Sequence, residues 1–135
     1  MPARDDPATA GGCPCGLGEP YGNCCGRFHR GDTPAPTAEA LMRSRFSAFA
    51  VGDEAYLLRT WHPAARPRGP LGLDPEQRWS GLEIVGRGGG GLFDAEGTVE
   101  FVAHYTWRGR PDALRENSRF VRDGGHWLYV GPITT

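Results

Sequence analysis

Residues 38–66 read AEALMRSRFSAFAVGDEAYLLRTWHPAAR, and this stretch decides the fold. Apolar side chains recur along its first half at the spacing of one helix face. They are Leu41, Met42, Phe46, Ala48 and Phe49. Thr37 is a residue type that caps helices at their N-terminus, and Gly52 is one that ends them. The pattern therefore predicts a helix from Thr37 to about Val51.

The second half of the stretch predicts a shorter helix, which begins at the cap Asp53, runs to about Trp61 and stops at Pro63. Strand-like segments with turn signals between them follow the helices. They are residues 79–85, 98–107, 114–121 and 126–130. Helices followed by consecutive hairpin-joined strands predict an α+β fold, with an antiparallel sheet curled over the helices.

Composition sets limits on what the chain does. The 135 residues are 39% hydrophobic, enough for one modest core. The formal charge of −1 gives no net attraction to nucleic acid or acidic membranes. No apolar run is long enough to span a membrane, and the first 12 residues contain no apolar signal segment, so we expect a cytoplasmic protein. All 15 basic residues are arginine, which reflects either GC-rich coding or recognition of carboxylate and phosphate groups.

The cysteines fall close together in the order Cys-Pro-Cys, eight residues, Cys-Cys. They are Cys13, Cys15, Cys24 and Cys25. A small cytosolic chain rarely keeps two disulfides, and a disulfide between adjacent cysteines needs a strained ring. Four thiolates satisfy the tetrahedral preference of zinc completely and leave no position for a catalytic water. The pattern therefore predicts one structural zinc ion.

Residues 13–26, CPCGLGEPYGNCCG, resemble the SEC-C zinc motif at the C-terminus of the SecA translocation ATPase. That motif reads Cys-x-Cys, eight residues, Cys, then His or Cys. The resemblance implies the four cysteines as ligands. His29 lies four residues past Cys25 and is an alternative to one of them. In SecA-like proteins the motif contacts proteins and ribosomes, but the lysines that it carries between its ligands are absent here. We therefore expect a protein partner at this knuckle and no nucleic acid.

Residues 38–66, VEFVAHY (99–105), ENSRF (116–120) and HWLYVG (126–131), together with the knuckle, resemble the YchJ family. The resemblance implies a cone-shaped domain of the nuclear-transport-factor-two-like class, and it brings no established activity. We expect a disordered tail over residues 1–12, the zinc knuckle over 13–30 and the α+β domain over 37–135.

Strand alternation predicts which side chains face the core. One face of the longest strand carries Val99, Phe101, Ala103, Tyr105 and Trp107, and one face of the next carries Leu114, Glu116, Ser118 and Phe120. Glu116 is then a carboxylate among apolar residues and needs a partner. Arg43 and Arg45 of the first helix are the candidate donors. The group forms either a structural Arg–Glu pair or a ligand pocket, which Trp61, His104 and Trp127 would complete.

Two classes of function remain open. One is a non-enzymatic binding or adaptor module, which binds a protein partner through the knuckle or an anionic small molecule through arginine. The alternative is a small-molecule enzyme of the isomerase or dehydratase type that uses a pocket in the cone. No convincing acid/base pair is visible in the sequence, so we expect the binding module.

Overall fold

The computed structural model describes residues 12–133. The disordered tail predicted over residues 1–12 thus lies outside the described residues, except for Gly12. Within the described part, no helix combines the length and the apolar character needed to cross a membrane.

Two consecutive helices, α2 (Ala38–Val51) and α3 (Glu54–Arg59), form as the local sequence predicts. The Thr37 side chain accepts a hydrogen bond from the backbone of the first turn of α2, and Gly52 ends that helix with a left-handed φ of 79°. A side chain would be strained at that φ, which is why glycine ends the helix here. Asp53 caps α3 by accepting from the backbone N–H of Tyr56.

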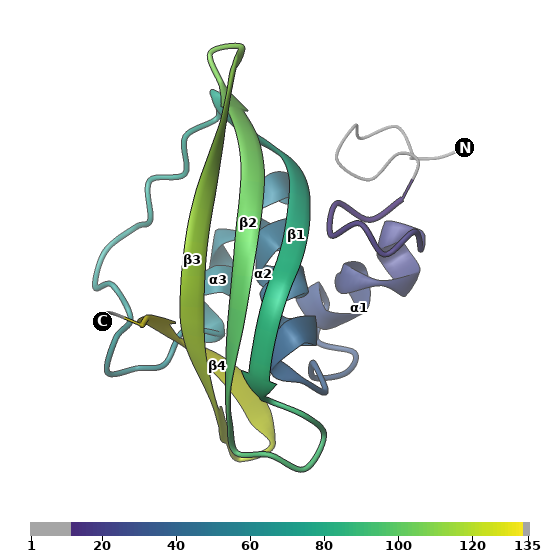
Figure 1. Cartoon of the computed structure of the whole chain (residues 1–135), viewed down its shortest axis with the longest axis vertical. Helices are drawn as coiled ribbons and strands as arrows, with labels where there is room; N and C mark the ends of the chain where they lie inside the picture. The colour runs from purple at the N-terminus through teal and green to yellow at the C-terminus, as the bar shows by residue number, and fades with distance from the viewer. Residues whose placement is uncertain (1–11, 134–135) are drawn as a thin grey trace.

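The strands form one antiparallel sheet in the order β1-β2-β3-β4 (Figure 1). Their bounds are Gln77–Gly89, Glu96–Trp107, Arg110–Asp123 and His126–Pro132. All four strands are longer than predicted, and β1 continues into the glycine run that had indicated a turn. Pairing explains the difference, because β2 continues to bond with Gly88 and Gly89 beyond the last apolar residue of β1.

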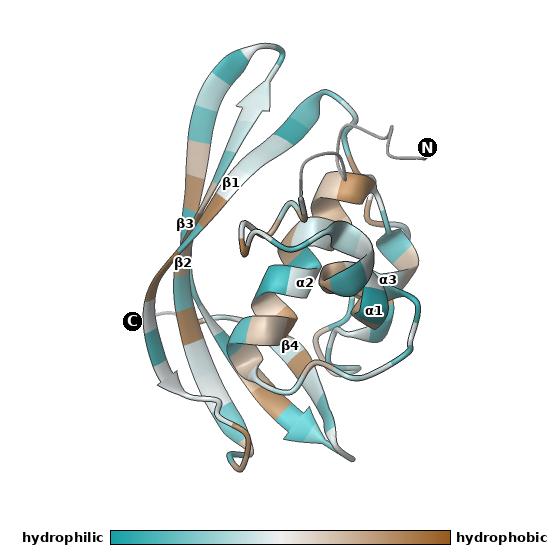
Figure 2. Cartoon of the chain, turned by 90° about the vertical axis from the view of Figure 1, so that its right-hand side faces the viewer, coloured by the Kyte–Doolittle hydropathy of each residue, from teal (hydrophilic) through white to brown (hydrophobic). Residues whose placement is uncertain are grey.

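The helices cover a single face of the sheet, which curves around them (Figure 2). Val99, Phe101 and Ala103 of β2 are buried there against α2, as alternation predicts. Alternation also predicts Trp107, at the end of the strand, on the core face, and this prediction was wrong. Trp107 is 40% exposed, because it is the last residue of β2 and its indole N–H reaches the exposed carboxylate of Asp74.

Main-chain hydrogen bonds join the end of α3 to β4. The Tyr129 N–H donates to the Thr60 carbonyl, and the His62 N–H donates to the Tyr129 carbonyl, both at 2.8 Å. Trp61 and Tyr129 form a short parallel bridge there and pack their rings edge to face. These contacts close one end of the space between the helices and the sheet.

The cysteine knuckle contains a 3-10 turn, η2 (Tyr21–Asn23), and the short helix α1 (Cys25–His29). The knuckle packs against α2, and so against the body of the protein, which consists of α2, α3 and the sheet. Phe28 of α1 belongs to the main hydrophobic core and is 7% exposed. The division into a knuckle over 13–30 and a domain over 37–135 stays a prediction, with this contact lying across its boundary.

Candidate metal centre and interior cavity

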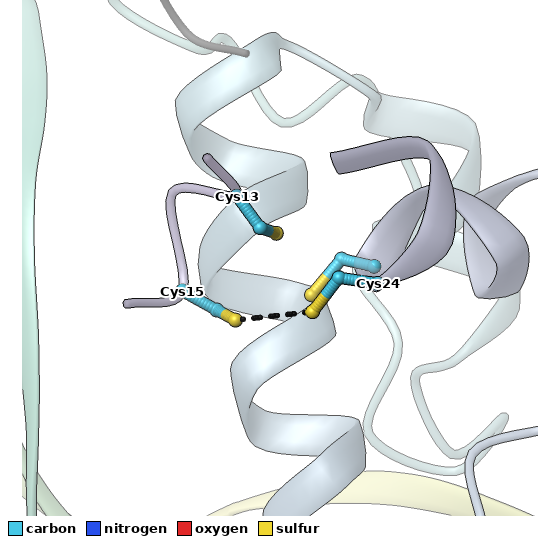
Figure 3. Close-up of side chains that lie close together, drawn as sticks. Cys13, Cys15 and Cys24 are labelled. Atoms are coloured by element: carbon cyan, nitrogen blue, oxygen red, sulfur yellow. Dashed lines mark hydrogen bonds between the residues drawn. The ribbon is translucent and has the colours of Figure 1, made fainter. Parts of the chain in front are cut away.

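Four cysteine side chains meet in one small cluster. Cys13 and Cys15 lie in the loop before η2, Cys24 follows η2, and Cys25 begins α1. All four are buried, and their sulfur atoms lie within 4.8 Å of one another. Figure 3 shows Cys13, Cys15 and Cys24 pointing toward one another. The cluster therefore presents four sulfur donors to one point.

The spacing of the sulfurs suits a tetrahedral metal site. Zinc–sulfur bonds of about 2.3 Å place the sulfurs of a tetrahedron about 3.8 Å apart. The Sγ atoms of Cys15 and Cys24 are 3.6 Å apart. A disulfide would bring them to about 2 Å, and all four cysteines are free thiols. The donor set fits zinc in both chemistry and geometry.

The protonation of the four thiols depends on whether the cluster holds a cation. The hydrogen bond from Cys15 lowers the pKa of the Cys13 thiol most, and the hydrogen bond from Cys25 lowers it further. The hydrogen bond with Cys13 raises the pKa of Cys15 to about 12 and also raises the pKa of Cys25. Neighbouring thiolates repel one another, so all four ionise together only around a positive charge. A divalent metal ion would supply that charge.

The knuckle backbone fits closely around the cluster. The Cys13 N–H donates to the Glu19 carbonyl at 2.8 Å, which closes the turn that carries the first two cysteines. Gly26 lies against Tyr21, and a Cβ at Gly26 would come within 2.7 Å of the Tyr21 carbonyl oxygen and 3.1 Å of its ring. Only glycine fits there without displacing the backbone beside Cys25.

Side chains of α2 and α3 bond to the knuckle, and arginines within the knuckle bond to its own backbone. Ser47 of α2 is fully buried, and its hydroxyl contacts the sulfur of Cys13. Four arginines donate to main-chain carbonyls of the knuckle: Arg27 to Cys24 (3.1 Å), Arg30 to Gly22 (3.1 Å), Arg43 to Cys15 (2.8 Å), and Arg59 to Phe28 and His29 (3.1 and 2.9 Å). A zinc ion with four thiolates has a net charge of −2, which Arg27 and Arg43, bonded to the carbonyls of two of the cysteines, would partly offset.

His29 is engaged elsewhere and is not part of the sulfur cluster. Its Nε2 lies 2.8 Å from the carbonyl oxygen of Ser44, so Nε2 carries the proton and donates. Its Nδ1 lies 2.5 Å from the hydroxyl of Tyr21. Burial raises the pKa of Tyr21 to about 12, so the tyrosine keeps its proton and donates to Nδ1. Both ring nitrogens are therefore occupied, which leaves the four cysteines as the candidate ligand set.

A partly open cavity of about 320 Å³ lies between α2 and the inner face of the sheet. Its walls are mostly aromatic and aliphatic, and its polar members are Arg45, Gln77, Glu116 and Tyr129. Of the residues predicted to form a pocket, Arg45, Trp61 and Glu116 line this cavity. The predicted inward position of Glu116 follows from its pairing opposite Phe101, which faces the core.

The predicted Arg–Glu pair was wrong. Glu116 accepts hydrogen bonds at Oε2 from the hydroxyls of Ser118 (2.5 Å) and Tyr129 (2.7 Å). Arg45 instead donates from Nη1 to the Leu57 carbonyl and to Thr60, each at 2.8 Å. Neighbouring hydroxyls on the sheet reach the carboxylate, whereas the arginine caps the end of α3.

Three other predicted pocket residues do not line the cavity. Arg43 lies at the knuckle, because residues two positions apart on a helix face different sides and Arg45 takes the inner one. His104 lies on the outer face of the sheet, where Nε2 is 2.6 Å from Glu83. Trp127 is buried in the core and donates from its indole to the Pro36 carbonyl.

Two residues that hold the knuckle to the body were not predicted from the sequence. Ser47 gave no signal of its own, although it lies one helical turn after Arg43 and so shares its face of α2. Arg59 was one of many arginines, and nothing in its spacing pointed to the end of α1 thirty residues earlier. Both assignments depend on how the knuckle docks onto the body.

Comparisons with known proteins agree with this architecture. Residues 37–132 match the family model described as the middle NTF2-like domain of YchJ. A UPF0225 protein of Streptomyces avermitilis is 56% identical over 128 residues, which cover 95% of this chain and 86% of that protein.

Two solved structures resemble the whole arrangement. The solution structure of a SEC-C motif containing protein from Rhodopseudomonas palustris has a TM-score of 0.77 and 30% identity, over 91% of this chain and 98% of that one. The crystal structure of a SEC-C motif containing protein from Psychrobacter arcticus has a TM-score of 0.70 and 29% identity, over 91% and 82% of the two chains.

Proposed function

This chain belongs to the YchJ family, and we propose that its four cysteines bind one structural zinc ion. The observation that carries the proposal is the buried cluster of four sulfurs, all within 4.8 Å of one another. Four thiolates fill the coordination sphere of zinc, so the ion would have no open position for substrate or activated water. The SEC-C motif of the two solved relatives supports the same assignment.

The zinc would fix the knuckle to the body. Ser47 and Arg43 of α2 reach Cys13 and Cys15 from the body side, so a metal that orders those cysteines also orders the contact with α2. Because the thiols must lose their protons to bind the ion, metal binding is coupled to the folding of the knuckle. The metal thus contributes to the shape of the surface between knuckle and body.

That surface suits a binding module better than an enzyme. An open groove of about 1160 Å³ lies where the knuckle meets the end of α2 and the start of β1. Its walls include apolar residues of the body and residues of the knuckle: Phe49, Leu73, Trp79 and Leu82, with Cys13, Pro14 and Gly16. An extended peptide segment of a protein partner is the ligand that such a groove would accept.

The enzyme alternative, an isomerase or dehydratase, depends on acid/base groups in the interior cavity. Glu116 lines that cavity, but His104 lies on the outer face of the sheet beside Glu83. Two such groups near one substrate are what proton-transfer chemistry of this type needs. In the described lining of the cavity Glu116 is already hydrogen-bonded to Tyr129 and no histidine lies beside them, which is why we favour binding.

Site-specific photocrosslinking tests the binding role. A benzophenone side chain at Ser80, in the groove, should capture one discrete protein in cells, and purified zinc-loaded chain should bind that protein directly. The matched position is Val85, which is exposed on the same strand but outside the groove. Capture should disappear in Cys24→Ser. Equal capture at Val85, or capture that survives Cys24→Ser, would exclude a zinc-ordered groove as the binding surface.

A further inference from the structure

The interior cavity contains a buried arginine with free hydrogen-bonding capacity. Arg45 is 3% exposed and uses Nη1 alone for its bonds to Leu57 and Thr60. Its Nε and Nη2 donate to no other residue that the structure describes. Every fully enclosed side-chain nitrogen or oxygen in that part of the chain has a partner. We infer that the free nitrogens keep accessible surface, and Arg45 has the cavity beside it.

Aromatic rings hold this guanidinium group in place. Its carbon lies 4.5 Å from the ring centre of Tyr129 and 5.0 Å from that of Trp61. Burial lowers the pKa of Arg45 to about 10, which still leaves it charged at neutral pH. The cavity therefore presents a fixed cation between aromatic walls, with donors not used by the protein.

Glu116 provides a free hydrogen-bond acceptor in the same cavity. Its Oε2 accepts from Ser118 and Tyr129, whereas its Oε1 accepts from no other residue in the described part of the chain. Burial raises the pKa of Tyr129 most, and the hydrogen bond to Glu116 raises it further, so this tyrosine remains a donor. Arg45 and Glu116 form no ion pair with each other. A ligand thus meets a free donor and a free acceptor in a site with no net charge.

We propose that the cavity binds a small, uncharged, largely aromatic molecule whose polar group accepts from Arg45 and donates to Glu116, as a phenol or a carboxamide does. The volume of about 320 Å³ is at the lower end for ligand pockets. Phe46, Trp79 and Phe101 supply apolar walls for the ring. A carboxylate, the anionic ligand expected from the arginine content, would pair with Arg45 but would also be repelled by Glu116.

Three naphthalene probes separate these chemistries: 2-naphthol and naphthalene-2-carboxamide are neutral at pH 7, and 2-naphthoate is an anion. Each is titrated into the full-length, zinc-loaded chain and followed by amide and indole chemical shifts. The neutral probes should saturate, shift the signals of Trp61 and Tyr129, which line the cavity and not the groove, and bind at least about tenfold more tightly than 2-naphthoate, a difference typical of one unfavourable charge contact.

Glu116→Gln should reverse this preference. Without the carboxylate, Arg45 is an unopposed cation, and the affinity for 2-naphthoate should rise about tenfold or more relative to 2-naphthol. The matched control is Glu100→Gln. Glu100 lies on β2 beside Phe101 and pairs with Arg115 on the outer face, so this variant should keep the wild-type order. Melting curves of both variants show whether they are folded.

Several outcomes would overturn the proposal. They are the absence of saturable binding of any probe to the wild-type chain, shifts centred on the knuckle groove, and tighter binding of 2-naphthoate than of the neutral probes. If Glu116→Gln does not fold, the order of the three probes on the wild-type chain decides alone.

Discussion

The hydroxyl of Ser47, in the middle of α2, lies 3.4 Å from the sulfur of Cys13 in the knuckle. The two residues are 34 positions apart in the chain, and both are buried. A thiolate at Cys13 would accept this hydrogen bond, as metal-bound sulfurs commonly do. The body of the protein therefore contributes directly to the metal centre.

Ser47→Ala should weaken metal binding by about 10- to 100-fold, because the variant removes a donor to a ligand sulfur. Competition with a chromogenic chelator measures the affinity. The matched control is Ser44→Ala, one turn earlier on α2. Ser44 is equally buried but bonds to Tyr56 and the Leu41 carbonyl. This control should lose stability and keep its metal affinity, and equal metal affinities in the two variants would contradict a role for Ser47.

Gly26→Ala should destabilise the knuckle by about 1–3 kcal/mol, the usual cost of overpacking. The new methyl group would lie 2.7 Å from the backbone oxygen of Tyr21, which cannot move without moving η2. Urea unfolding of the metal-loaded chain measures the change. At Gly22 the nearest atom to a new Cβ is 3.9 Å away, so Gly22→Ala should cost much less. Equal costs at the two positions would show that the knuckle is looser than described.

His29 should make the protein sensitive to mild acid. Burial lowers its pKa below the usual 6.5, so below pH 6.5 the unfolded chain binds a proton that the folded chain does not. The free energy of unfolding therefore falls as pH drops through 6.5, and this loss ends at the lower pKa of the folded state.

Urea midpoints between pH 7.5 and 5.5, with metal content checked at each pH, measure this slope. His29→Gln retains a donor for Ser44 and an acceptor for Tyr21, and should flatten the slope. His126→Gln, at an exposed position, should leave it unchanged. A slope that persists in His29→Gln would assign the acid sensitivity to another group.

Deleting residues 1–32 tests whether the body folds without the knuckle. A cooperative thermal transition should remain, because the deletion keeps every member of the main core except Phe28. Its stability should fall by about 3–5 kcal/mol, the cost of losing a buried aromatic side chain, since Phe28 goes with the deletion. Phe28→Ala in the full chain is the comparison. A truncated chain without any cooperative transition would make knuckle and body one folding unit.

Local signals in the sequence predicted the parts of the fold that depend on neighbours in the chain. Thr37, Gly52 and Asp53 set the ends of the helices, and the alternation through Val99 and Phe101 identified the core face. Each of these features needs only a few adjacent residues. The same is true of the cysteine spacing, which predicted the composition of the cluster.

The partners of charged groups were not predictable in this way. Glu116 pairs with Tyr129 because β4 folds back beside β3, with an irregular register near Phe120. The helix period would have separated Arg43 from Arg45, since residues two apart face different sides. The helix period would not have shown that the knuckle packs against the side of α2 that carries Arg43. Contacts between distant segments decide these pairs.

X-ray absorption at the zinc edge, on protein purified without chelator, tests the central claim most directly. We predict one zinc ion per chain with four sulfur neighbours at about 2.3 Å and no nitrogen or oxygen in the first shell. Less than half an equivalent of metal, with Cys24 and Cys25 oxidised, would contradict the account.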